Sequence, residues 1–131
     1  PPLGREALII YPDRLMTHLI EALLPAGTLG VLMPHAGQHD GMVAKWSTAT
    51  RSTMTAVASP YSAADGIATE VRGLVEAGAQ AIVHDCMGFD RRMLADARAA
   101  TDKPVILANG IVGAVLRETV DLSVALLDQV Q

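Results

Sequence analysis

The chain has 131 residues, of which 50% are hydrophobic and 18% charged, and this composition excludes a disordered tail or a solvated linker. The formal net charge of -4 offers no basic surface for nucleic acid, and no apolar run reaches the roughly 18 residues that a membrane-spanning helix needs. A single cysteine permits no internal disulfide and suits a reducing compartment. We therefore expect one cytoplasmic globular domain, with neither nucleic acid nor membrane as a partner.

The first half of the chain alternates short β-forming runs with helical periodicity. We expect strands over 7–11, 29–33 and 54–58, because each run is followed within two residues by a proline. The first connecting segment predicts a helix with an apolar stripe of Leu15, Leu19, Ile20, Leu23 and Leu24, and the second predicts a shorter helix with Met42, Val43 and Trp46 on one face.

The second half continues the same alternation. Ser62 and Asp65 form a capping box ahead of a helix that Gly78 ends. Strands are expected over 81–85 and 104–107. Asp90 and Asn109 are the expected N-caps of the two remaining helices, which carry apolar stripes of Met93, Leu94 and Ala97 and of Ile111, Val112, Val115, Leu116, Leu122 and Leu126. This pattern predicts a doubly wound α/β fold with a mainly parallel sheet of about four to five strands and helices on both faces.

A parallel sheet of this kind binds ligands beyond the carboxyl ends of its strands. The residues that follow the expected strands are therefore the candidate binding residues for a small-molecule ligand. They are Pro34, His35, Ser59, Pro60, Tyr61, Met87, Gly88 and Asn109, together with Cys86.

Cys86 is the candidate catalytic residue. It follows a buried strand and precedes a helix, so backbone N–H groups can stabilise a thiolate that acts as a nucleophile or as a proton-transfer base. The alternative is a buried, inert thiol, which is the commoner state of a lone cysteine. Asp90 counts against bound anions, because a capping carboxylate competes for the same amides. Gly88 permits a close backbone approach or a positive φ, or is a plain turn glycine.

Other polar residues allow weaker interpretations. His35 and His39 flank a loop and could bind substrate or relay protons, but their spacing with Cys86 matches no zinc site, so no metal is expected. Arg91 and Arg92 either hold an anionic substrate or form a solvated helix start. His84, inside an expected strand, is interpreted as structural.

Several segments occur together in an order that resembles the second half of AroM family proteins. They are Gly30-Val31-Leu32-Met33-Pro34, Lys45-Trp46, Ala58-Ser59-Pro60-Tyr61, Asp85-Cys86-Met87-Gly88-Phe89 and Pro104-Val105-Ile106-Leu107-Ala108. AroM proteins in turn resemble the aspartate/glutamate/hydantoin racemase superfamily. That resemblance implies two similar α/β lobes with an active site between them and no cofactor.

The resemblance also implies a role for Cys86. Each racemase lobe contributes one cysteine, because inverting a carbon needs a base on one face and an acid on the other. Cys86 matches the cysteine of the second lobe. Amino-acid racemases carry Thr after that cysteine, whereas Met87-Gly88 is closer to the hydantoin racemases. The departure argues against amino acids and favours a small carboxylate or cyclic amide as substrate.

By the same resemblance, we expect this chain to be truncated, with residues 28–131 forming the second lobe and residues 7–24 supplying a strand and a linking helix of an absent first lobe. With one thiol per chain, racemisation needs a second group, so we expect an isolated chain to be inactive and a homodimer to form over the exposed inter-lobe surface. The alternative function is a non-catalytic metabolite-binding or regulatory protein that keeps the same cleft.

Overall fold

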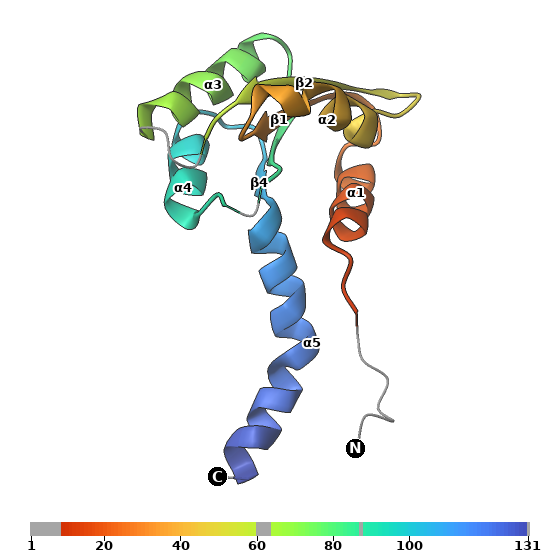
Figure 1. Ribbon diagram of the computed structural model, residues 1–131, viewed down its shortest axis with the longest axis vertical. Helices are drawn as coiled ribbons and strands as arrows, with labels where there is room; N and C mark the ends of the chain where they lie inside the picture. Colours follow the sequence, from red (N-terminus) through yellow and green to blue (C-terminus); the bar gives the residue numbers. More distant parts are fainter. Residues whose placement is uncertain (1–8, 60–63, 87, 131) are drawn as a thin grey trace.

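The computed structural model describes residues 9–59, 64–86 and 88–130. These residues form a four-stranded, wholly parallel sheet in the order β2-β1-β3-β4, with helices on both faces (Figure 1). The doubly wound α/β prediction is confirmed. In chain order the elements are α1 (Pro12–Leu23), β1 (Gly27–Met33), the short 3-10 helix η1 (Ala36–Gln38), α2 (His39–Trp46), β2 (Arg51–Val57), α3 (Ala64–Glu76), β3 (Ala81–His84), α4 (Arg91–Ala99), β4 (Val105–Leu107) and α5 (Ala108–Val130).

The central strand β1 organises the sheet. It pairs with β2 along its whole length, from Gly27 opposite Arg51 to Met33 opposite Val57, and its other side pairs with β3. Residues 29–33 are all buried, because helices cover the strand from both sides. This double burial is the reason that the strand reads as a continuous apolar run.

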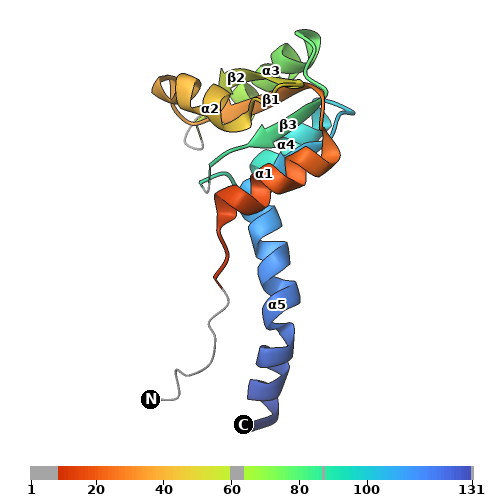
Figure 2. The same cartoon turned by 90° about the vertical axis from the view of Figure 1, so that its right-hand side faces the viewer.

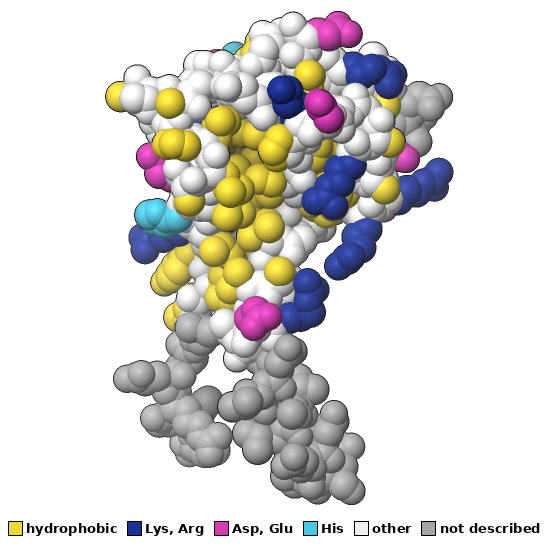
Figure 3. Space-filling model, turned by 180° about the vertical axis from the view of Figure 1, so that it is seen from behind, with side chains coloured by type: hydrophobic (Ala, Val, Ile, Leu, Met, Phe, Trp, Pro, Cys, Tyr) yellow, Lys and Arg dark blue, Asp and Glu magenta, His cyan; other side chains and the backbone are white. Residues whose placement is uncertain are grey.

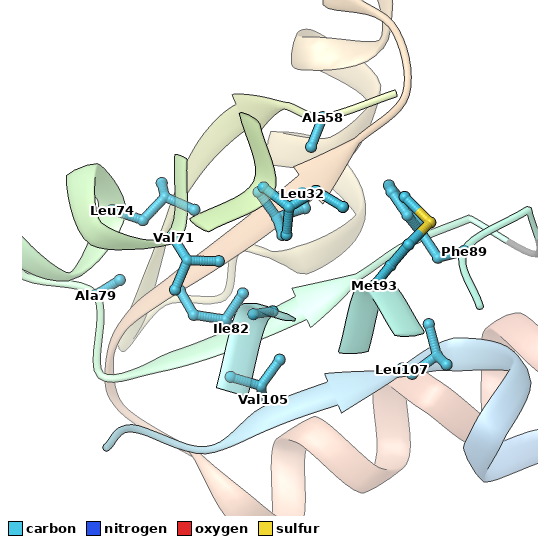
Figure 4. Close-up of a cluster of buried hydrophobic side chains, with 12 residues drawn as sticks. Leu32, Ala58, Val71, Leu74, Ala79, Ile82, Phe89, Met93, Val105 and Leu107 are labelled. Atoms are coloured by element: carbon cyan, nitrogen blue, oxygen red, sulfur yellow. The ribbon is translucent and has the colours of Figure 1, made fainter. Parts of the chain in front are cut away.

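Alternate residues of β1, β3 and β4 enter two separate apolar clusters. Leu32 and Ile82 point toward α3 and α4, where Figure 4 shows them packed with Val71, Phe89 and Met93. The opposite face packs against α1 and α2, and its cluster comprises Met16, Ile20, Leu29, Val31, Trp46, Ala81, Val83, Ile106 and Ala108. The two clusters therefore cover opposite faces of the sheet.

The segment before α1 differs from its prediction. Residues 9–11 form no strand, and residues 7 and 8 lie outside the described part of the chain. Ile9 and Tyr11 are 65% and 55% exposed. A strand needs a neighbour for its backbone hydrogen bonds, and this segment pairs with none of the four strands. The stripe predicted on α1 is also partly wrong, because Leu23 is 59% exposed.

Two predicted helix ends are confirmed and one is wrong. The Asp90 carboxylate accepts a hydrogen bond from Met93 N at 2.9 Å and caps α4, and Gly78 ends α3 with a φ of +111°. Asn109 is not a cap, because α5 begins at Ala108 directly after β4, so Asn109 lies in the first turn. The capping box proposed at Ser62 lies outside the described residues.

Helix α5 leaves the carboxyl edge of the sheet and extends away from the body of the protein (Figures 1 and 2). Its first turns contact β4 and α1. Among the described residues, no helix is both long and apolar enough to cross a membrane.

Arg51 is a buried residue that the sequence analysis did not single out. Its Nε and Nη2 donate to the carbonyl of Trp46 at 3.0 and 2.8 Å, and its Nη1 donates to the carbonyl of Leu24 at 2.9 Å. These carbonyls lie at the ends of α2 and α1, where helices leave acceptors unpaired. One side chain therefore caps both helices that cover this face of the sheet.

His84 is a fully buried histidine in β3. Its ring lies 4.9 Å from that of Phe89, and among the described residues neither ring nitrogen has a hydrogen-bond partner. Burial, helped by the nearby Arg98, lowers the pKa of His84 from 6.5 to about 4. The ring is therefore neutral in the folded protein at neutral pH.

Replacing two glycines near the end of α3 by alanine should change the free energy of unfolding in opposite directions. A Cβ on the exposed, helical Gly73 meets nothing within 4 Å, so Gly73→Ala should stabilise the protein by about 1 kcal/mol. Gly78→Ala should destabilise it by about 1–2 kcal/mol, because its positive φ disfavours a side chain. Urea denaturation measures both free energies of unfolding, and equal shifts of the same sign would contradict this reading of the backbone.

His84 predicts an acid-dependent loss of stability. The unfolded chain takes up the proton near pH 6.5 and the folded chain only near pH 4. Proton uptake by His84 thus leaves the free energy of unfolding unchanged above pH 6.5 and lowers it by up to about 3 kcal/mol as the pH drops to 4. In His84→Leu this pH-dependent part of the free energy of unfolding should vanish. Urea denaturation curves of both proteins from pH 7 to pH 4 test this, and parallel pH profiles would refute it.

Candidate functional site

The strand order places the topological switch point of the sheet between β1 and β3. The chain passes from β1 to β2 on one side and then returns across β1 to β3 on the other, so the direction of winding reverses between β1 and β3. Ligands of doubly wound sheets bind at this reversal, outside the carboxyl ends. Pro34 and His35 follow β1 there, and Asp85 and Cys86 follow β3.

Cys86 lies in a tight turn at this point. Its side chain is half-buried and packs against the cluster formed with α3 and α4. The backbone N–H of Gly88 points at the sulfur, with 3.3 Å between N and Sγ, and Phe89 N lies 3.4 Å from the carbonyl oxygen of Cys86. Gly88 is exposed and does not adopt a positive φ, so its contribution is this N–H contact.

Asp85, beside Cys86, is the centre of a charged network. Its Oδ2 accepts from Lys45 Nζ and from Trp46 Nε1, each at 2.9 Å, and its side chain is only 13% exposed. Lys45 also pairs with the exposed Asp13 at 2.7 Å. Burial opposes the charge on Lys45, but its hydrogen bonds to Asp13 and Asp85 outweigh burial and raise its pKa above the usual value. The network joins α1, α2 and β3.

The network residues had no functional assignment in the sequence analysis, although the motifs that carry the family resemblance contain Lys45, Trp46 and Asp85. Their separation of 39 or 40 positions gave no sign of contact. Only the packing of α2 over the end of β3 brings them together.

The candidate residues after β1 have structural partners. His35 caps η1, because its Nδ1 accepts from the N–H of Gly37 at 3.0 Å. His39 is hydrogen-bonded through its Nδ1 to Thr55 Oγ1. Pro34 is half-buried and His35 is exposed. Among the described residues, no group of three or more His, Cys, Asp or Glu side chains could hold a metal ion.

Asn109 and Ser59 lie at the outer strands of the same edge. Asn109 Nδ2 donates to the carbonyl of Phe89, which ties the start of α5 to the Cys86 turn. Asn109 also lines a hollow of about 370 Å³ at the end of β4, whose lining does not include Cys86. Ser59, half-buried, follows β2. The candidate residues Pro60, Tyr61 and Met87 lie outside the described part of the chain.

The two acidic partners of Lys45 predict unequal effects on stability. Lys45→Met leaves the largely buried Asp85 without its cation and should lower the free energy of unfolding by about 1–3 kcal/mol. Asp13→Asn removes an exposed partner and should change it by less than about 1 kcal/mol. Urea denaturation at pH 7 compares the two, and a larger loss in Asp13→Asn would contradict the role given to Asp85.

A family model described as AroM protein matches residues 1–120, which include all four strands and every candidate residue at the carboxyl edge. No curated protein and no solved structure matches the sequence. Because the match covers more than half of the chain, this protein belongs to the AroM family.

Proposed function

We propose that this chain is one lobe of a cofactor-independent racemase or isomerase, in which Cys86 exchanges a proton with a carbon atom of a small carboxylate or cyclic amide. The observation that carries the proposal is the reversal of winding between β1 and β3, with Cys86 at the end of β3. In doubly wound sheets this is the point where ligands bind. Pro34, His35, Ser59, Pro60, Tyr61, Met87, Gly88 and Asn109 are the proposed surroundings of the ligand.

One hydrogen-bond donor is directed at the sulfur of Cys86. The Gly88 N–H directed at Sγ is a donor to the negative sulfur. The neighbouring Asp85 carboxylate is paired with Lys45, with 2.9 Å between Oδ2 and Nζ, and Lys45 is shared with the exposed Asp13. The proposed base therefore lies beside an ion-paired carboxylate and not beside an isolated one.

The proposed step is a proton transfer that needs no cofactor. The Cys86 thiolate removes a proton from a carbon bonded to a carbonyl group, and the electron pair of the C–H bond moves into the carbonyl as an enolate. A proton returns to the carbon from the same thiol, which retains configuration, or from a group on the opposite face, which inverts it.

Inversion needs a second proton-transfer group on the opposite face of the carbon, and this chain has no second thiol to serve as that group. We propose that another lobe or a second copy of the chain, as in a homodimer, supplies it. Exposed Ile9, Tyr11 and Leu23, on α1 and just before it, offer apolar surface to such a partner.

The second candidate function is ligand binding without catalysis. It is favoured by one observation: Cys86 packs against the apolar cluster, and it does not line the hollow beside Asn109. In this case Cys86 is a packing residue and the polar groups of the edge hold a metabolite.

Proton exchange in D2O distinguishes the two functions. We expect the protein to replace the acidic C–H hydrogen of a ligand with deuterium, with inversion only if a second group is present. NMR measures the exchange over a panel of amino acids, 5-substituted hydantoins and dicarboxylates. Cys86→Ala should slow the exchange at least about 100-fold, in line with acid–base catalysis, and leave ligand binding intact.

Two outcomes oppose the enzyme proposal. Exchange at the parental rate in Cys86→Ala would remove Cys86 from the reaction. Saturable binding of a panel member with no exchange above the buffer rate would favour the binding protein.

A further inference from the structure

Two adjoining hollows lie between α4 and α5, along the free edge of β4. The first, of about 370 Å³, has Arg91, Asn109, Gly113 and Arg117 in its lining. The second, of about 200 Å³, has Leu94, Arg98, Val105 and Ile111 in its lining. Both hollows share Arg91, Leu107 and Gly110 in their linings, so the two hollows adjoin.

The first hollow is positively charged. Arg91 comes from the start of α4 and Arg117 from α5, and among the described residues neither forms an ion pair. Gly113 leaves room for Arg117, whose Nη1 lies 3.7 Å from the place that a Cβ on Gly113 would take. Asp90 also lines this space, but its carboxylate accepts the Met93 N–H and caps α4. The two guanidinium groups are therefore the groups left to bind an anion.

The second hollow is apolar with one further cation. Leu94, Val105 and Ile111 form walls from α4, β4 and α5, and Arg98 Nη2 donates to the carbonyl of Val105 at 3.1 Å. β4 is an edge strand, so no fifth strand of the described chain covers this side. Figure 3 shows the molecule from behind as a broad apolar surface bordered on one side by Lys and Arg side chains.

We propose that these hollows form one binding site for a small amphipathic organic carboxylate. The carboxylate lies between Arg91 and Arg117, whose planar guanidinium groups fit its two oxygens. The apolar body of the ligand extends along β4 between Leu94 and Ile111, where it is removed from water. The site does not use Cys86, although Asn109, which is also among the proposed surroundings of the Cys86 ligand, lines its first hollow.

The arginine pair at the start of α4 supplies a matched control. Arg91 and Arg92 are neighbours, both exposed, but Arg91 lines both hollows and Arg92 is in the lining of neither. Replacing either one removes the same charge from the same turn. A general electrostatic effect would weaken binding equally in the two variants, whereas a built site responds only to Arg91.

The test is an NMR titration of the ¹⁵N-labelled protein with hexanoate, acetate, hexanol and inorganic phosphate. Hexanoate should shift the amide signals of Gly110 and Gly113 saturably and bind at least tenfold more tightly than the other three probes. Arg91→Gln and Arg117→Gln should each weaken hexanoate binding at least tenfold. Arg92→Gln should stay within twofold of the parent, and so should Cys86→Ala.

Each other result overturns the proposal. Equal affinity for hexanol would show that the arginines do not bind the carboxylate, and equal affinity for acetate or phosphate would show that the apolar groove is not used. If Arg91→Gln and Arg92→Gln weakened hexanoate binding equally, or if the amide signals of Gly110 and Gly113 did not shift, the proposed site would be wrong. Because Cys86→Ala keeps this site intact, a failure of proton exchange leaves the titration result unaffected.

Discussion

The carboxylate of Asp85 fixes the geometry at the centre of the carboxyl edge. One of its oxygens accepts from both Lys45 and Trp46, and Lys45 reaches on to Asp13 at the start of α1. A carboxylate with so little exposure is stable only when such partners compensate its lost hydration. The positions of α1 and α2 and the direction in which the Cys86 turn leaves the sheet therefore depend on one another.

The same edge offers two chemically different places. Between β1 and β3 a half-buried thiol lies next to the ion-paired Asp85 carboxylate, and this is where we propose proton transfer. Between α4 and α5 two guanidinium groups border an apolar groove, which suits binding. Asn109 links the two places, because it lines the second and donates to the backbone of Phe89 beside the first.

Sequence patterns predicted the features that depend on a few neighbouring residues. The Asp90 cap and the left-handed Gly78 involve local backbone geometry, and both were found as expected. Buried β1 and β3 were also found, because a strand enclosed on both faces must be apolar throughout. The positions after these strands were identified correctly as strand ends, since the carboxyl edge follows from parallel pairing. Their roles in ligand binding remain proposals.

The failures have a common physical origin. A β-forming run at 7–11 indicates a strand only if a partner strand lies beside it, and over residues 9–11 none does. Asn109 has a capping side chain, but α5 follows β4 without a loop, so the side chain bonds to Phe89 instead. Arg51 received no prediction, because its burial under the ends of α1 and α2 depends on residues far from it in the sequence.

The amino-acid order by itself determined the alternation of strands and helices, the parallel sheet and the edge at which polar residues collect, because these follow from periodicity and from caps within one or two turns. Tertiary structure alone decided which distant residues meet. Lys45 and Asp85 are 40 positions apart, and Arg91 and Arg117 come from different helices. Such pairs depend on how the helices pack on the sheet, and that packing is set by the whole core and not by any local pattern.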